Sequence, residues 1–134
     1  MFKCRVGSLG KAGVDGDVDA RLEEFVECCR HRFGWEVKIE KTPDGTVILA
    51  SEQPASPEEE FYFRFRTEDG AIFLANLKIP AGKRRQGVGS ACVNWLKETA
   101  GDLGFAEIIL ESYPSAVGFW EKMGFSLKEE EEEF

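Results

Sequence analysis

The stretch AIFLANLKIPAGKRRQGVGS, residues 71–90, decides the fold, because it holds a strand, a glycine-containing turn and the beginning of a helix in direct succession. Residues 71–79 have the apolar character of a strand, and a polar turn at 68–70 precedes them. After Gly82 the apolar positions follow the three- and four-residue spacing of one helix face as far as Leu103. The stretch therefore predicts a strand that leads through a turn into an amphipathic helix.

The turn itself has the properties of an anion-binding site. Its glycines let the backbone approach a ligand closely, and the free amides and positive dipole end of the following helix face that ligand. Lys83, Arg84 and Arg85 add three positive side chains. An ordinary glycine-containing loop with solvated basic residues has the same spacing and remains an alternative. A Walker loop is excluded, because Val88-Gly89 stands where that motif has Lys-Ser/Thr, and no GxGxxG is present.

The remaining sequence predicts strands and helices on both sides of this stretch. Two hairpins are expected around the turn signals at 42–45 and 68–70. The other elements we expect are a strand at 2–6, a helix from Val18 with Asp17 as N-cap and Gly34 as its stop, a buried strand at 106–111, a short helix at 115–123 and a last strand from Phe125.

Length and charge narrow the class of protein. A chain of 134 residues, 43% of them hydrophobic, predicts a single domain over 1–134 with an acidic tail at 129–134. The apolar runs are too short to span a bilayer and the N-terminus does not resemble a signal peptide, so we expect a cytoplasmic protein without membrane contact. The net charge of −8 argues against nucleic acid as a partner, since neutralising phosphates requires a basic surface, and it favours a cationic small partner.

The cysteines and the single histidine indicate no metal site. The four cysteines form no CxxC pair, and Cys28 and Cys29 are adjacent on an expected helix, which suits neither zinc nor a disulfide framework. We expect reduced thiols in the core. His31 is the single histidine of the chain and has basic neighbours, Arg30 and Arg32, so no metal-binding residue is predicted.

Two segments carry a resemblance to a known family. Residues 84–89, RRQGVG, match the Q/R-x-x-G-x-G/A signature of the GCN5-related N-acetyltransferases (GNAT), and residues 115–125, SAVGFWEKMGF, are similar to that family's A-x-x-F-Y-E-K-x-G-F motif. The two motifs occur in the family's order, each with an expected strand ahead of it. The resemblance covers residues 71–125, and the first 60 residues carry no recognisable motif.

The resemblance implies an α/β fold in which helices flank a central mixed, mostly antiparallel sheet. It also implies acetyl-coenzyme A as cosubstrate, with its pyrophosphate on the amides of the turn and its pantetheine arm along the backbone of 77–79. The thioester would lie where the strands from Ala71 and Ala106 separate. The residues that the resemblance assigns to coenzyme A are Leu77, Lys78, Ile79, Lys83, Arg84, Arg85, Gln86, Gly87, Val88, Gly89, Ser90, Phe119, Trp120 and Lys122.

In this family an amine attacks the thioester directly, so no nucleophilic cysteine is expected. A backbone amide near Lys78 or Ile79 would polarise the thioester oxygen. For the base that accepts the ammonium proton we choose Glu111, because the end of its strand borders the cleft in this fold. Glu60, Glu68 and a chain of water molecules are the alternatives.

The sequence departs from the family at the residue that usually acts as the acid. Trp120 stands where the motif has tyrosine, and its indole N–H is a donor only. Tyr113, shortly before the same helix, is our candidate for protonating the departing thiolate, with water as the alternative.

The resulting expectation is an N-acetyltransferase that acts on a primary amine of a small molecule or peptide. The alternative is a non-catalytic module that binds or senses acyl-coenzyme A, motivated by Trp120. The acceptor is left open, because the early helix and loops that would select it carry no motif. Assembly is open between monomer and homodimer, and the tail at 129–134 either docks a protein partner or stays solvated.

Overall fold

The computed structural model describes residues 2–7 and 18–128. The expected cap Asp17 and the expected tail at 129–134 lie outside these ranges. The described strands are β1 (Phe2–Gly7), β2 (Val37–Lys41), β3 (Thr46–Ser51), β4 (Tyr62–Glu68), β5 (Ala71–Lys78), β6 (Glu107–Ser112) and β7 (Ser126–Lys128). The helices are α1 (Val18–Phe33), α2 (Val88–Asp102) and α3 (Val117–Lys122), with 3₁₀ turns η1 (Pro57–Glu59), η2 (Ala81–Lys83) and η3 (Pro114–Ala116).

The elements expected from the sequence are present in the expected order, with shifts at their ends. The hairpin expected around 42–45 begins at Val37, and the helix expected at 115–123 begins as the 3₁₀ turn η3 before it becomes α3. Helix α1 ends before Gly34, where the chain turns with a positive φ of 70°. The spacing of apolar residues and the turn signals were therefore sufficient to predict these strands and helices.

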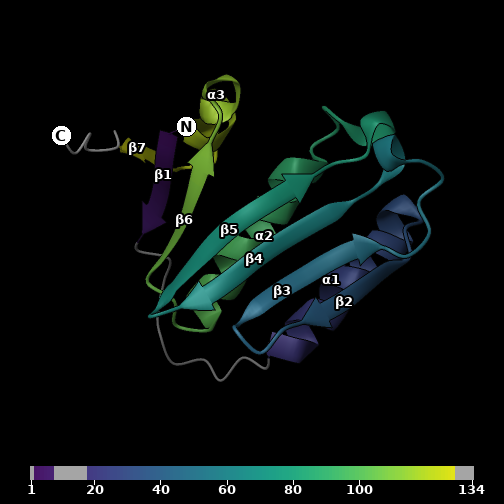
Figure 1. Cartoon of the computed structure of the whole chain (residues 1–134), viewed down its shortest axis with the longest axis horizontal. Helices are drawn as coiled ribbons and strands as arrows, with labels where there is room; N and C mark the ends of the chain where they lie inside the picture. The colour runs from purple at the N-terminus through teal and green to yellow at the C-terminus, as the bar shows by residue number, and fades with distance from the viewer. Residues whose placement is uncertain (1, 8–17, 129–134) are drawn as a thin grey trace.

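The strands form one mixed sheet in the order β2-β3-β4-β5-β6-β1-β7 (Figure 1). Neighbouring strands are antiparallel except β5 and β6, which run parallel because α2 crosses between them. The expected α/β fold with a mixed, mostly antiparallel sheet and flanking helices is confirmed. The position of β1 is the unexpected feature, because the first strand of the chain lies between β6 and β7.

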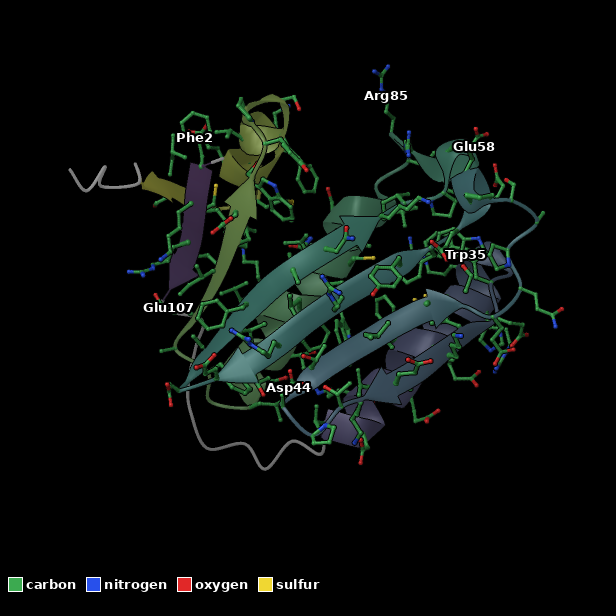
Figure 2. The ribbon with its side chains drawn as sticks, in the orientation of Figure 1. Phe2, Trp35, Asp44, Glu58, Arg85 and Glu107 are labelled. Carbon is green, nitrogen blue, oxygen red and sulfur yellow. The ribbon has the colours of Figure 1, made fainter. Side chains whose placement is uncertain are left out.

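The helices cover one face of this sheet. Helices α1 and α2 lie side by side behind β2–β5 in Figure 1, and Lys97 of α2 donates from Nζ to the carbonyl oxygen of Met123 at the end of α3, at 2.8 Å. On β4 the side chains of Phe63 and Phe65 are buried under the helices, whereas Arg64 and Arg66, which alternate with them, are exposed. The described part of the chain places no helix over this opposite face, which we call the open face (Figure 2).

The core is rich in aromatic rings that hold α1, α2 and β4 together. Phe25 of α1 packs against Trp95 of α2 with ring centroids 4.8 Å apart, and against Phe63 of β4 at 5.8 Å. Burial of each such ring stabilises the fold by roughly 1.5–3 kcal/mol, and the ring contacts add to this. Within the described residues, no helix has the length and apolar character needed to cross a membrane.

Three of the four cysteines are core thiols, as expected from the sequence. Cys4, Cys29 and Cys92 are buried free thiols, and burial raises the pKa of Cys29 and of Cys92 to about 12. Cys28 is exposed, so the expectation of a core thiol is wrong for this residue. Cys28 lies on the outer side of α1, whereas the next residue, Cys29, belongs to the helix's apolar stripe.

Candidate functional site

Strands β5 and β6 separate near the middle of the sheet. Their parallel pairing runs from Ala71 to Leu74, which lies opposite Leu110, although β5 continues to Lys78 and β6 to Ser112. Figure 1 shows the two strands diverging toward their C-terminal ends. On its other side this part of β5 still pairs with β4. In the described structure the backbone of residues 75–78 therefore has one edge without a strand partner.

A β-bulge coincides with the point of separation. The register between β4 and β5 shifts so that Arg64 and Phe65 lie opposite Asn76 and Leu74, which leaves Ala75 as the extra residue. Bulges bend the strand that contains them and increase its twist. The bulge at Ala75 thus accounts for the departure of β5 from β6 immediately after Leu74.

A cavity of about 300 Å³ fills the gap between the two strand ends. Its lining comes from both strands and from the turn and helix that follow β6: Leu74, Ala75, Asn76, Leu77, Leu110, Glu111, Ser112, Tyr113, Ala116 and Trp120. We call this the splay cavity. It brings together Leu77, Glu111, Tyr113 and Trp120, four of the residues that the sequence assigned to a site.

A second cavity of about 300 Å³ adjoins the same gap and is lined by side chains of the open face, including Lys3, Phe73 and Ile109. It shares Leu74, Ala75, Leu110 and Glu111 with the splay cavity. The alternation of side chains along a strand places Phe73 and Ile109 on the face opposite to the core residues on either side of them. The gap between β5 and β6 is therefore accessible from both faces of the sheet, and Glu111 contributes to both sides.

The predicted base and acid lie at the end of β6. Glu111 is exposed there, and Tyr113, two residues further on, is 68% exposed. The alternative base Glu60 is paired with Lys78, and the distance from Glu60 Oε1 to Lys78 Nζ is 3.8 Å. Glu68 lies opposite Ala71, at the far end of β5, where it pairs with Arg66, so it is separated from the splay cavity.

The glycine-containing turn follows directly from the unpaired end of β5. In α2 the first intrahelical bond is donated by Ala91 N to Gly87 O at 3.0 Å, so the amides of Val88, Gly89 and Ser90 have no acceptor within the helix. Gly87 has a φ of 79°, in the left-handed region that favours glycine, and this conformation reverses the chain into the helix. The side chain of Val88 is buried, so its amide is the part that can face a ligand.

Two polar side chains of the turn hold its shape. Arg84 Nε donates to Ile79 O at 3.3 Å, and Gln86 Nε2 donates to Gly82 O at 3.0 Å. Arg85 adopts a positive φ of 63°, and its side chain points away from the fold in Figure 2. The described residues offer no carboxylate in an ion pair with Lys83, Arg84 or Arg85. The turn therefore presents uncompensated positive charge in an otherwise acidic protein.

Helix α3 closes the site from the side of α2. A methyl group built on Gly89 would lie 3.5 Å from Cζ of Phe119, so the ring packs over the first turn of α2. Trp120 packs against Phe119 and Phe125, with ring centroids 4.9 and 5.4 Å away, which fixes it beside the splay cavity. Lys122 is exposed on the same helix.

The side chain of Lys78 is held by residues 57–60, next to the turn. Its Nζ donates to the carbonyl oxygen of Pro57 and pairs with Glu60. Only the backbone of Lys78 is therefore directed along the free edge of β5. Within the described residues, no three histidine, cysteine, aspartate or glutamate side chains converge as a metal site.

Sequence reasoning missed Asn76 and Ser112, which also line the splay cavity. Ser112 is 2% exposed, and its Oγ donates to Tyr113 O at 2.8 Å, which braces the chain where it leaves β6. Asn76 carried a usable signal, because strict alternation after Ile72 and Leu74 would place this polar side chain in the core. A polar residue at an expected core position indicates a bulge one residue earlier.

A comparison with protein families agrees with this geometry. The chain matches the model of the family described as the acetyltransferase (GNAT) family over residues 18–125. The matched range contains β5, the turn, α2, β6 and α3, and thus every element of the site, whereas β1 and β7 lie outside it. No curated protein sequence matches the chain with significance.

Proposed function

Because the chain belongs to the GNAT family of acetyltransferases, we propose that it transfers the acetyl group of acetyl-coenzyme A to a primary amine of a small molecule or peptide. The observation that carries this proposal is the continuity of three features. The splay cavity, the unpaired backbone edge of 75–78 and the free amides of the turn follow one another along the chain. A thioester, an amide-containing arm and a pyrophosphate follow one another in the same order in acetyl-coenzyme A.

In this proposal the backbone of Leu77, Lys78 and Ile79 binds the pantetheine arm. The pyrophosphate lies on the amides of Val88, Gly89 and Ser90, where the helix dipole favours negative charge. Among the side chains, Lys83 and Arg85 add positive charge, while Arg84 and Gln86 hold the turn in shape. Phe119, Trp120 and Lys122 border the cofactor from α3.

The acceptor would enter from the open face, because the gap between β5 and β6 is accessible on that side as well. Its amine nitrogen forms a bond to the acetyl carbonyl carbon, and the carbon–sulfur bond breaks to release the thiolate. A backbone N–H near Lys78 or Ile79 donates to the carbonyl oxygen as negative charge develops there. No covalent bond to the enzyme is formed.

Two protons leave the acceptor nitrogen in this reaction, and one proton reaches the thiolate. Glu111 accepts the first proton from the ammonium, which becomes a neutral amine before it attacks, since Glu111 lies in both cavities and so between donor and acceptor. The second proton passes from nitrogen to solvent once the carbon–nitrogen bond has formed. Tyr113 donates a proton to the thiolate, because it lines the splay cavity and Trp120, which also lines it, cannot exchange one.

The test is acetyl transfer to a panel of primary amines, followed by mass spectrometry of the products. Glu111→Gln should lower kcat/KM by about 10²–10⁴-fold, and Tyr113→Phe should lower kcat by about 10²-fold. Glu107→Gln is the matched control, since Glu107 lies on the same strand and face but pairs with Arg5 at the other end. Unchanged turnover in Glu111→Gln and Tyr113→Phe would remove both roles and leave the proton transfers to water.

Trp120 favours a second candidate function, the binding or sensing of acyl-coenzyme A without transfer. An indole beside the thioester can pack against the acyl group and donate a hydrogen bond, but it cannot deliver a proton. Binding of acetyl-coenzyme A without product from any amine in the panel would favour this candidate. Product from any amine, abolished by Glu111→Gln, would exclude it.

A further inference from the structure

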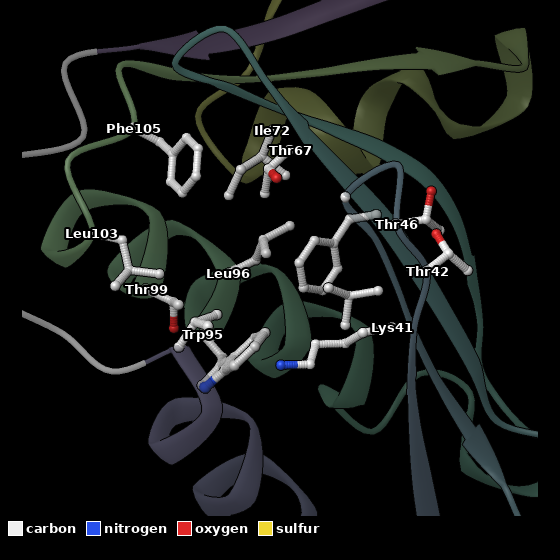
Figure 3. Close-up of a pocket in the computed structure, with 14 residues that line it drawn as sticks. Lys41, Thr42, Thr46, Thr67, Ile72, Trp95, Leu96, Thr99, Leu103 and Phe105 are labelled. Atoms are coloured by element: carbon white, nitrogen blue, oxygen red, sulfur yellow. The ribbon is translucent and has the colours of Figure 1, made fainter.

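A separate cavity of about 380 Å³ lies at the other end of the core from the splay cavity (Figure 3). It is bordered by the C-terminal half of α2, the start of α1 and the ends of β3, β4 and β5. Thr99, which lines it, follows Val88 of the turn by eleven residues on α2, or about 16 Å along the helix axis. The cavity is therefore distinct from the acetyl-coenzyme A site.

The walls of this cavity are mainly apolar. Its described lining includes the side chains of Val47, Phe65, Ile72, Leu96, Leu103 and Phe105. Protein cores contain few voids larger than a water molecule, and an apolar cavity of about 150 Å³ already accommodates benzene. The cavity is thus large enough for a substituted six-membered ring.

Two polar atoms in the wall have no hydrogen-bond partner among the described residues. Thr99 is 3% exposed, and within residues 2–7 and 18–128 neither its Oγ1 nor the buried Nε1 of Trp95 is hydrogen-bonded. Residues four apart on a helix share a face, so these two groups lie one turn apart on the same side of α2. Packing of Trp95 against Phe25 at 4.8 Å and against Phe65 at 6.3 Å holds the indole in a fixed direction. Buried polar groups in folded proteins are normally hydrogen-bonded, so this pair is available to bond a polar atom of a ligand.

The charge of the lining limits the class of ligand. Lys41 is the only charged residue among the described lining residues, and its ammonium is in an ion pair with Asp19 of α1. No unpaired charge of the described lining therefore faces the cavity. A ligand that fits is neutral, largely apolar, and carries one oxygen that can both accept from Trp95 and bond to the Thr99 hydroxyl.

We propose that this cavity is a binding site for a small neutral aromatic alcohol. The ring occupies the space between Phe65, Leu96 and Phe105, while its hydroxyl oxygen accepts from Trp95 Nε1 and its hydroxyl hydrogen is donated to Thr99 Oγ1. The proposal is independent of acetyl transfer, because it involves none of the residues of the splay cavity or the turn.

The test uses two probes of almost equal shape, 4-cresol and toluene, which differ in the hydroxyl group. The chain contains three tryptophans, so ¹H–¹⁵N spectra show few indole N–H signals, and Trp95→Phe assigns the relevant one. Titration with 4-cresol should shift the Trp95 signal downfield in a saturable manner. Toluene should bind about tenfold more weakly, because it leaves both polar atoms unpaired.

A hydroxyl deletion separates specific binding from filling of an apolar space. Thr99→Val keeps the shape of the side chain and should weaken 4-cresol binding about threefold to tenfold, with toluene binding unchanged or tighter. Thr46→Val, a hydroxyl deletion on the β3 side of the same cavity, should leave both affinities within about twofold. Backbone amide spectra of each variant verify that it is folded. Absence of a Trp95 shift, equal affinity for the two probes, or unchanged 4-cresol binding in Thr99→Val would each overturn the proposal.

Discussion

Gly45 and Gly70 are each the last residue of a hairpin turn, but they differ in what surrounds them. Both have positive φ, 88° and 79°, so an alanine at either position adopts a left-handed conformation that costs about 1–2 kcal/mol. A methyl group on Gly45 would in addition lie 2.9 Å from the carbonyl oxygen of Thr67, whereas one on Gly70 meets nothing within 4 Å. Gly45 therefore joins the β2–β3 turn to β4, and Gly70 only reverses the chain.

We expect Gly45→Ala to lower the free energy of unfolding by roughly 3 kcal/mol or more, because the backbone must shift, and Gly70→Ala by about 1–2 kcal/mol. Urea unfolding of the two variants measures the difference directly. Equal destabilisation of the two variants would mean that the close contact between the added methyl group at position 45 and the carbonyl oxygen of Thr67 is relieved at no cost in free energy.

Asp44, in the same turn as Gly45, makes stability depend on pH. Its Oδ1 accepts from the hydroxyl of Thr42 and from Thr46 N, the latter at 3.1 Å, and the hydrogen bonds from Thr42 first and Thr46 second hold the pKa of Asp44 below its ordinary value. Folding therefore favours the charged form. The stabilisation is fully present above the unfolded pKa, about 3.9, and is lost as pH falls through the lower folded pKa.

Asp44→Ala should accordingly be less stable than the wild type at pH 7, and the difference should shrink as the pH falls below about 3. Asp44→Asn retains an oxygen acceptor and should lose less at neutral pH. Thermal unfolding across this range provides the test, and a difference between wild type and Asp44→Ala that stays constant with pH would contradict the role of the carboxylate.

At the scale of elements, the bulge in β5 is the feature that opens the site. Leu74 and Leu77 face the core, while Asn76 lies opposite the outward Arg64. Removal of Ala75 would restore regular alternation and leave each of these side chains on its present face. The extra residue thus contributes to the separation of β5 from β6 and is not needed for packing.

Deletion of Ala75 should therefore preserve or raise stability and weaken acetyl-coenzyme A binding by at least about tenfold, because a regular β5 can continue its pairing with β6 beyond Leu74. Deletion of Gln53, in the loop between β3 and η1, is a control for shortening the chain outside the sheet. Calorimetric titration with acetyl-coenzyme A measures the affinity of both variants, and thermal unfolding measures their stability. Retained binding without Ala75 would show that the bulge is incidental to the site.

The sequence predicted the elements because each is set by a local pattern, such as the apolar stripe from Val88 to Leu103 and the turn signals at 42–45 and 68–70. The turn of the site was predictable for the same reason, since its glycines and cations are contiguous. The bulge at Ala75 was overlooked, although it is indicated by the polar residue Asn76 at a position where strict alternation predicts a core side chain. Cys28 was expected in the core with the other three thiols because their spacing fits neither zinc nor disulfides. The apolar stripe of α1 contains Cys29 and not Cys28, whose side chain is turned outward.

At the scale of the whole molecule, the pairing of the first strand could not be predicted from local patterns. β1 pairs with β6 from Phe2 opposite Ser112 to Gly7 opposite Glu107, and with β7 on its other side. Beyond Leu110, where β5 has departed, β1 is the strand partner that holds Glu111 and Ser112 in place. The N-terminal strand thus supports the candidate base from more than a hundred positions away in the sequence.

For the whole molecule, we propose that acetyl-coenzyme A binds to the free edge of β5 and to the turn that follows it. Gly87 and Gly70 provide a matched pair for testing it, because both have a φ of 79° and neither has an atom within 4 Å of an added Cβ. Gly87 lies at the turn of the site, and Gly70 lies in the β4–β5 hairpin at the other end of β5. A tryptophan at either position causes the same backbone strain, but only one of them obstructs the turn.

Isothermal titration with acetyl-coenzyme A, and with ATP as a phosphate-bearing ligand without the pantetheine arm, tests the claim most directly. We predict that wild type and Gly70→Trp bind acetyl-coenzyme A with affinities within about twofold, that Gly87→Trp binds at least about tenfold more weakly, and that ATP binds weakly to all three. Absence of acetyl-coenzyme A binding by the wild type, or undiminished binding by Gly87→Trp, would contradict the account.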